Sequence, residues 1–307
     1  MIVVGRRRRK PEDSVLAAIK HQVWYVALKE GRKAVRRRLA LRRFRGDDYQ
    51  CPVCGTRLNG FKPIWKSWWR AIAEHHYRYP VAAIETFNAN AYSCPACDAS
   101  DRERLYALYL DRIAATLDRS RRYRFVEFAP SMPLRRRLRR LPFIDYRSAD
   151  LHRRSVDDRI DITAMRYGDA SIDMILCSHI LEHIPDDRQA MREMLRVLVP
   201  GGLAIVMVPL IVGLDETLED PAIDTRELRW THYGDGDHVR QYGKRDFLDR
   251  LRAAGFTVER LGIDDFGVET FRRAGIAENS ELIVARKPAA HDPEKGEPVF
   301  GQDHARA

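Results

Sequence analysis

Four of the five cysteines form two Cys-x-x-Cys pairs, separated by 39 residues. Each pair can present two thiolates to one tetrahedral ion, and Gly55 permits the tight turn of the first pair. This spacing predicts a structural zinc site, whose ligands would be Cys51, Cys54, Cys94 and Cys97. A redox-active pair is the alternative, as is His75 or His76 in place of one cysteine.

Candidate site residues also follow three segments that read as strands, the last of them, 172–177, apolar and β-branched. Such segments, separated by helical patterns, predict a parallel, doubly wound α/β sheet. Ligands bind such sheets beyond the carboxyl ends of the strands, near the point where the strand order reverses. The positions to inspect are therefore Glu127–Ser131, Asp150 and Cys177–His179.

The elements that must position these residues can be read from hydrophobic periodicity. Helices are expected at 63–76, 101–117, 134–140, 186–198 and 244–254, the fourth ending at the Pro200-Gly201-Gly202 stop. Strands are expected at 124–128, 144–149, 157–163, 172–177, 203–208, 256–262 and 281–286.

The charge of the chain is concentrated at one end. The net charge is +10, and residues 1–50 hold 15 basic and 5 acidic residues, so the rest of the chain is balanced. Residues 11–45 have a helical pattern with one apolar stripe, which can pack on the protein body or lie on a membrane. Residues 6–45 are therefore a candidate contact for a polyanion or an anionic membrane surface, or simply a solvated terminus.

Composition excludes some classes of protein. Hydrophobic residues make up 45% and charged residues 32%, which excludes wholesale disorder. The longest apolar run, Leu203 to Leu214, contains a proline, so no transmembrane helix is expected. The odd cysteine count, with no secretory signal after Arg6–Arg9, predicts a cytoplasmic protein, with membrane-peripheral placement as the variant.

Two motifs flank the helix expected at 186–198. Residues 178–183 read Ser-His-Ile-Leu-Glu-His, and residues 196–202 read Arg-Val-Leu-Val-Pro-Gly-Gly. Together they resemble class I S-adenosylmethionine-dependent methyltransferases of the type 11-like branch. Residues 237–243, Asp-His-Val-Arg-Gln-Tyr-Gly, resemble a subgroup that also has N-terminal Cys-Pro-x-Cys pairs. The resemblance covers about residues 51–286 and implies a Rossmann-like, seven-stranded, mostly parallel sheet.

The resemblance also implies a domain organisation. A basic amphipathic helical arm is expected at 1–48 and a zinc-ribbon-like module with an insertion at 49–100. The methyltransferase domain would occupy 101–287, with residues 210–243 as an insertion that caps the substrate. Residues 288–307 are expected to be a disordered tail.

The cofactor implied by the resemblance is S-adenosylmethionine. Asp150 would accept hydrogen bonds from the ribose hydroxyls, a task suited to a carboxylate because it is acceptor-only. Asp161 and Ile162 would lie along the adenine, and Glu127 could serve the cofactor's amino group. The full candidate set is Glu127, Ala129, Pro130, Ser131, Asp150, Asp161, Ile162, Cys177 and Ser178, although Cys177 is equally typical of a buried strand residue.

The first loop departs from the family pattern. Family members usually have a glycine-rich loop here, whereas this chain reads Glu127-Phe128-Ala129-Pro130-Ser131-Met132. Glycines allow close approach of the backbone to the cofactor. Their absence raises the alternative of a methyltransferase scaffold that has lost turnover and binds nucleic acid or membrane through its basic arm and zinc module.

Histidines are the candidate proton acceptors, because imidazole exchanges protons most readily near neutrality. His179, just past a strand, and His238 are the catalytic candidates, whereas Glu182 and His183 are expected to hold the loop together. His232, Arg240 and Tyr242 are the candidates for substrate contact, Arg240 as a clamp for a carboxylate or phosphate or as a surface ion pair. The expected acceptor is an oxygen or nitrogen of a small molecule or glycan, with a nucleic acid ranked lower. The oligomeric state is left open.

Overall fold

The computed structural model describes residues 41–289. Most of the predicted basic arm and nearly all of the predicted tail therefore lie outside the described residues. Within 41–289, no helix is both long enough and apolar enough to cross a membrane.

A seven-stranded sheet forms the centre of the molecule, in the order β5-β4-β3-β6-β7-β9-β8. All neighbouring pairs from β5 to β7 are parallel, and β9 runs antiparallel to both β7 and β8. This confirms the expected seven-stranded, mostly parallel sheet. The strands are β3 (Tyr123–Phe128), β4 (Ile144–Asp150), β5 (Asp158–Arg159), β6 (Ile172–Ser178), β7 (Leu198–Met207), β8 (Thr257–Leu261) and β9 (Leu282–Arg286).

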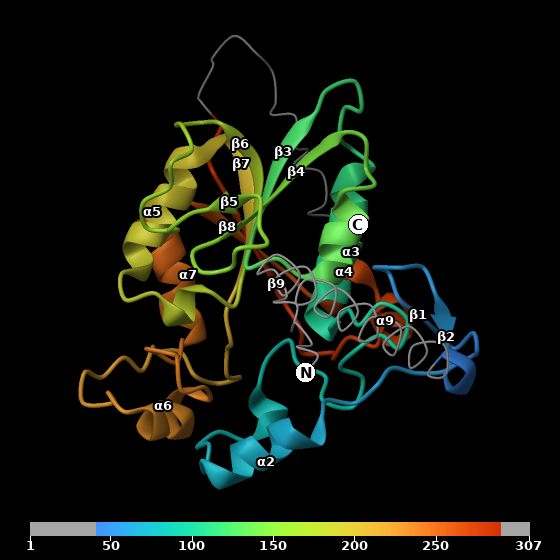
Figure 1. Cartoon of the computed structure of the whole chain (residues 1–307), viewed down its shortest axis with the longest axis vertical. Helices are drawn as coiled ribbons and strands as arrows, with labels where there is room; N and C mark the ends of the chain where they lie inside the picture. The colour runs from blue at the N-terminus through green and yellow to red at the C-terminus, as the bar shows by residue number, and fades with distance from the viewer. Residues whose placement is uncertain (1–40, 290–307) are drawn as a thin grey trace, which may run out of the picture.

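Helices cover both faces of this sheet. In Figure 1, α5 and α7 lie on one side of it and α3 and α4 on the other. The helices are α3 (Asp101–Ala114), α4 (Met132–Leu138), α5 (Asp187–Val197), α6 (Arg226–Tyr233), α7 (Lys244–Ala253), α8 (Ile263–Phe266) and α9 (Val268–Ala274). The first turn of α3 has a capping box between Ser100 and Glu103, which fixes where the helix begins.

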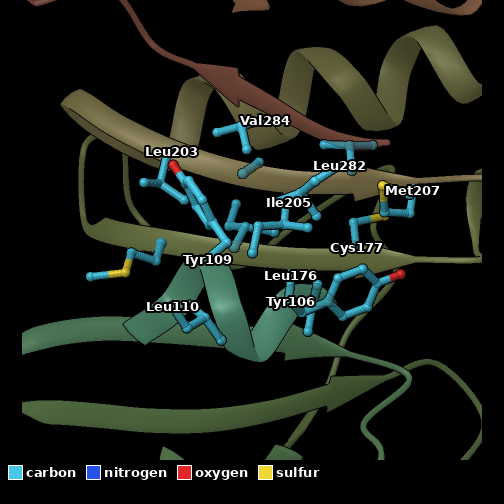
Figure 2. Packing of buried hydrophobic residues seen from close by; sticks show 14 of the residues in the cluster. Tyr106, Tyr109, Leu110, Leu176, Cys177, Leu203, Ile205, Met207, Leu282 and Val284 are labelled. Atoms are coloured by element: carbon cyan, nitrogen blue, oxygen red, sulfur yellow. The ribbon is translucent and has the colours of Figure 1, made fainter. Parts of the chain in front are cut away.

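The core lies between α3 and the central strands. Tyr106, Tyr109 and Leu110 of α3 pack on apolar side chains of β6, β7 and β9 (Figure 2). Both faces of β6 and β7 are covered, which explains why these strands are almost continuously apolar.

Two expected elements differ from the structure. The segment at 157–163 contributes only the two-residue strand β5, because residues 161–163 form a turn in which Asp161 accepts from the Thr163 amide and hydroxyl. The Pro200-Gly201-Gly202 stop lies inside β7, although the helix before it ends at Val197, close to the predicted end. There the register against β6 shifts, Gly201 has φ of 78°, and the glycines bond to Lys287 beyond β9.

Residues 49–100, called the cysteine module below, precede α3. The module contains the antiparallel pair β1 (Tyr49–Gln50) and β2 (Arg57–Leu58), then α2 (Lys66–Glu74) and the 3-10 turn η1 (Val81–Ala83). Its helix α2 lies near α6 (Figure 1), where His75 stacks on Trp230 and the Thr231 hydroxyl donates to the carbonyl of His75.

A buried arginine fastens the cysteine module to the domain. Arg104 of α3 is fully buried, and its guanidinium donates to carbonyls of both the module and the end of α9. It also lies 3.9 Å from the ring centroid of Phe61. The accepting carbonyls belong to Ala91, Tyr92, Ala99, Ala274 and Gly275.

Candidate functional site

Two cavities meet at the carboxyl end of β3. The neighbours of β3 are β4 and β6, so the strand order reverses here, as the sequence predicted. The first, called the β4 cavity, has a volume of 670 Å³, and the second, called the β3 cavity, 520 Å³. Phe128 and Ala129 line both, so the loop after β3 separates two halves of one site.

The β4 cavity contains the acidic residue predicted at the end of the second strand. One oxygen of Asp150 accepts from the amides of His152 and Arg153, each at 2.8 Å. The other lies 3.5 Å from Nε of Arg153. The turn thus fixes the carboxylate, and lone pairs of its second oxygen are left for a ligand in the cavity. Asp161, Ile162, His179 and His183 share this cavity.

The loop after β3 has an unusual backbone. Ala129 has φ of 47°, a left-handed conformation that glycine usually adopts, and its amide donates to the carbonyl of Ala149 at 2.9 Å. Ser131 caps α4 by accepting from the Leu134 amide at 3.3 Å. The chain therefore makes a glycine-like turn without a glycine.

The side chain of Glu127 holds the loop after β3 in place. It is buried, and its two oxygens accept from the Ser131 amide at 2.9 Å and the Tyr146 hydroxyl at 2.6 Å. Burial raises the pKa of Glu127 to about 7, although both hydrogen bonds act in the opposite direction. Glu127 lines the β3 cavity, so it both holds the loop and faces a ligand space.

The β3 cavity has walls from both parts of the chain. The methyltransferase-like sheet supplies residues 127–131, and Ser178 of β6 is hydrogen-bonded to Tyr106 of α3 at 2.8 Å. The cysteine module supplies a further wall. Its contributing residues are Lys62, Trp65, Tyr92, Ser93, Asp98 and Ser100.

His179 lies where the two walls approach one another. It has φ of 54°, and its Nε2 is 3.2 Å from a guanidinium nitrogen of Arg102. Arginine can only donate, so Nε2 of His179 accepts this hydrogen bond. Nδ1 of His179 lies 3.4 Å from a carboxylate oxygen of Glu182. Burial, and then the charge of Arg102, hold the pKa of His179 well below its usual range. The ring is therefore neutral at physiological pH.

Two residues of the capping insertion that were expected to contact substrate, Arg240 and Tyr242, are buried instead. Arg240, predicted to clamp substrate, is almost completely buried and donates to the carbonyls of Leu181 and Ile184 at 2.8 and 2.6 Å. Tyr242 is also buried and donates to Asp187 at 2.6 Å. Neither lines the two cavities, because both side chains hold the insertion against the loop after β6.

Two further candidates lie away from the cavities. His232, on α6, contacts a guanidinium nitrogen of Arg78 at 3.2 Å. Cys177 is completely buried in β6 among the core residues, so the expectation of a cofactor contact is corrected to a packing role. Burial raises the pKa of its thiol.

His238 belongs to neither cavity lining but lies beside Glu182. Its Nδ1 is 3.0 Å from the carbonyl of Tyr233, and burial lowers the pKa of His238 to about 4. Burial raises the pKa of Glu182 to about 8. The sequence assigns His238 to catalysis and Glu182 to loop structure, whereas in the structure the two residues lie side by side.

The four predicted metal ligands converge. The Sγ atoms of Cys51 and Cys97 are 3.8 Å apart, and those of Cys54 and Cys94 are 3.9 Å apart. Sulfurs bound tetrahedrally to zinc at about 2.3 Å are separated by about 3.8 Å. Hydrogen bonding within the cluster, first of all with Cys51, lowers the pKa of the Cys54 thiol. The donor set therefore fits a tetrahedral thiolate site.

Several lining residues were missed from the sequence. Arg102 and Tyr106 reach the β3 cavity from the first two turns of α3, and Trp65 from the cysteine module. Arg102 and Arg104 both follow Cys97, but helical spacing alone does not say which arginine faces a cavity. Trp65 is 55% exposed at the rim, a signal visible only in the structure.

Comparison with known proteins identifies the central part of the chain. Residues 122–206 match a family model that is described as a methyltransferase domain. A protein of Mycolicibacterium smegmatis, described as a probable S-adenosylmethionine-dependent methyltransferase, is 31% identical over 149 residues, or 46% of this chain and 50% of the relative. An uncharacterized methyltransferase of Mycobacterium sp. (strain KMS) is 41% identical over 51 residues, 17% of this chain and 20% of the relative. The matches thus span half or less of these relatives.

Solved structures with a similar fold are more distant. A methyltransferase dependent on S-adenosylmethionine from Mesorhizobium loti is 15% identical, with a TM-score of 0.39, and covers 59% of this chain and 98% of its own. The [4+2]-cyclase SpnF is 16% identical, with a TM-score of 0.39, over 75% of this chain and 98% of its own.

Proposed function

We propose that this chain, which contains a methyltransferase domain at residues 122–206, is an S-adenosylmethionine-dependent methyltransferase acting on an oxygen or nitrogen of a small-molecule or glycan acceptor. The observation that carries the proposal is the convergence of Ala129, Asp150 and Ile162 on connected cavities at the strand-order reversal. These residues come from three separate segments, and the sequence resemblance implies a cofactor contact for each.

The donor chemistry of the site fits this cofactor. In the proposal, Asp150 accepts from the ribose hydroxyls, and Ile162 packs on the adenine in the β4 cavity. The amino-acid end of the cofactor lies in the β3 cavity, where the Arg102 and Arg153 guanidiniums suit its carboxylate. When bound, the cofactor supplies a methyl group already activated by its sulfonium charge. The protein's own tasks are to orient the acceptor and to exclude water.

Calorimetric titration with S-adenosylmethionine and S-adenosylhomocysteine tests the proposal. Asp150→Asn keeps the oxygen that the turn uses and removes the second acceptor, so we expect affinity to fall about 10- to 100-fold. Asp145→Asn, on the exposed side of the same strand, is the matched control and should bind normally. If neither ligand binds wild-type protein, the proposal is wrong.

The cysteine module is proposed to hold one structural zinc ion. The supporting observation is the spacing of the four sulfurs given above. A closed thiolate site stabilises a fold and keeps no open position for substrate, so this ion has no proposed part in methyl transfer.

The alternative function is a binding protein that uses the same scaffold without turnover. Its motivation is the glycine-free loop together with the net +10 charge of residues 1–50. It predicts salt-dependent binding to a polyanion or to anionic vesicles, lost when Arg6–Arg9 are replaced by glutamine. Binding that is absent or insensitive to salt excludes this alternative.

A further inference from the structure

A second group of metal-ligating side chains lies apart from the four cysteines. Glu182, His183 and His238 each offer one donor atom, and these atoms all lie within 4.8 Å of one another. Glu182 and His183 follow β6 in the 3-10 turn η2 (Leu181–His183), whereas His238 comes from the capping insertion. Two segments 55 residues apart therefore meet at this point.

The carboxylate in this group has no hydrogen-bond partner. Glu182 is 1% exposed, and among the described residues neither of its oxygens is hydrogen-bonded. Two imidazole nitrogens approach one of its oxygens, Nδ1 of His179 at 3.4 Å and Nε2 of His238 at 4.0 Å. Buried carboxylates are normally paired or bind metal, so this orphaned group needs an explanation.

Both imidazoles are arranged as metal ligands usually are. Nδ1 of His238 lies 3.0 Å from the carbonyl of Tyr233, and Nδ1 of His183 lies 3.3 Å from the carbonyl of Asp237. Carbonyls only accept, so each Nδ1 carries the proton and each Nε2 keeps its lone pair. A ligating histidine typically donates its other ring N–H to such a carbonyl, which fixes tautomer and orientation.

The insertion is clamped so that these groups stay together. The amide of Val239 donates to the carbonyl of Glu182 at 2.8 Å. The next residue, Arg240, donates to the carbonyls of Leu181, Ile184 and Pro185 on both sides of Glu182. The buried arginine that was expected to bind substrate thus holds His238 beside the loop that carries Glu182 and His183.

We propose that Glu182, His183 and His238 form a binding site for a divalent transition-metal cation whose open side faces the β4 cavity. His183 lines that cavity and is exposed to it, which gives an ion a path of entry. Two imidazoles and one carboxylate suit Mn²⁺, Fe²⁺, Co²⁺ or Zn²⁺. Donors around an ion at about 2.1 Å are about 3–4 Å apart, so a small contraction completes the site.

Three protein ligands leave coordination positions free, as in catalytic rather than structural metal sites. Resting on the methyltransferase function proposed above, the site implies an acceptor that presents an oxygen ligand, a hydroxyl group, to the ion. A cation lowers the pKa of a hydroxyl that it binds, whereas Nε2 of His179 is already contacted by a guanidinium nitrogen of Arg102 at 3.2 Å.

The test is titration of the zinc-containing full-length protein with Mn²⁺, followed by electron paramagnetic resonance of the free ion. Mn²⁺ prefers oxygen and nitrogen donors, so it does not compete for the four thiolates. We expect one equivalent to bind wild type, and the Kd to rise at least 10-fold in Glu182→Gln, His183→Gln and His238→Gln. His76→Asn, an exposed histidine whose left-handed φ asparagine tolerates, should leave binding unchanged.

The outcomes separate this proposal from the proposed function. The site is refuted if neither Mn²⁺ nor Co²⁺ binds beyond the cysteine site, or if folded His183→Gln binds as wild type does. His183 is exposed, so this variant stays informative if the buried ones fail to fold, which circular dichroism reports. Bound Mn²⁺ should also enhance water proton relaxation; no enhancement means a closed site without acceptor access. Mn²⁺ binding is measured without S-adenosylmethionine, so it stands or falls independently of cofactor binding.

Discussion

Ala129 and His179 share a backbone conformation that few side chains adopt. Their φ angles are 47° and 54°, and they follow the two neighbouring strands at the strand-order reversal. A left-handed residue with a Cβ costs roughly 1–2 kcal/mol. Ala129 stands in the loop that the resemblance expects to be glycine-rich, and it keeps the left-handed conformation that glycine usually adopts.

Ala129→Gly should relieve this strain. The gain is partly offset by the greater freedom of glycine in the unfolded chain, so we expect a net stabilisation of about 0.5 kcal/mol. Ala73→Gly, at an exposed position of α2, should instead destabilise by about 1 kcal/mol. Urea unfolding of both variants measures the difference. Equal losses in the two variants would show that Ala129 is not strained.

Glu127 makes stability depend on pH. Its pKa rises from 4.5 to about 7 on folding, so the folded state favours the protonated carboxyl. Its contribution is therefore complete below pH 4.5 and is lost as pH rises to about 7. Over this pH range the free energy of unfolding falls by about 3 kcal/mol.

Glu127→Gln removes this dependence, since glutamine can accept from Ser131 and donate to the Tyr146 oxygen. The difference in unfolding free energy between wild type and variant should fall by about 3 kcal/mol between pH 4.5 and 7 and level off above. A constant difference across that range would show that Glu127 is ionised throughout.

At the scale of elements, the central strands could be predicted from the sequence, but the connections between elements could not. Runs such as 172–177 and 203–208 are almost wholly apolar, and both lie in central strands. Pro200-Gly201-Gly202 has the composition of a helix stop, but its neighbours pair with Ile172 and Lys287, so tertiary pairing overrides local preference. The short helices α8 and α9 lacked a long enough period to be detected.

Arg240 shows the same limit for a side chain. Its sequence context suited a substrate clamp, but its partners are backbone carbonyls 55 to 59 residues earlier in the chain and the carboxylate of Glu219. Sequence spacing cannot show that a charged group binds such partners inside the fold. By contrast Asp150, Asp161 and Ile162, all assigned to one site from the sequence, line the same cavity in the structure, because strand ends in a parallel sheet share an edge.

Arg240→Lys should therefore act on stability. Lysine cannot reproduce the planar fork, so buried carbonyls on the loop after β6 lose their donor, and we expect a cost of about 2–4 kcal/mol. Arg245→Lys, in an exposed ion pair with Glu216, should change stability by less than about 0.5 kcal/mol. Thermal unfolding of both gives the comparison, and similar small effects would mean that the clamp is not important.

At the scale of the molecule, the cysteine module and the sheet domain share a buried boundary. Arg104 donates across it, and α2 packs near α6 on the capping insertion. The module is thus attached at two places, one beside the core and one beside the insertion.

Removing zinc should therefore destabilise the whole molecule. We expect about one zinc per chain by atomic absorption, and a loss of at least about 3 kcal/mol of stability after chelation or in Cys54→Ser. Cys177→Ala, which alters a cysteine outside the cluster, should keep its zinc. Retention of zinc by Cys54→Ser would exclude the four-thiolate site.

The wall that the cysteine module gives to the β3 cavity has a consequence for how the protein matures. Lys62, Trp65, Tyr92 and Asp98 belong to the segment that carries the four converging cysteines. If the module holds the proposed zinc ion, a chain without zinc would lack this wall of the β3 cavity as well as the stability that the ion contributes. The supply of zinc would thus control whether the β3 cavity is complete, because in a chain without zinc this cavity would be open on the side of the cysteine module.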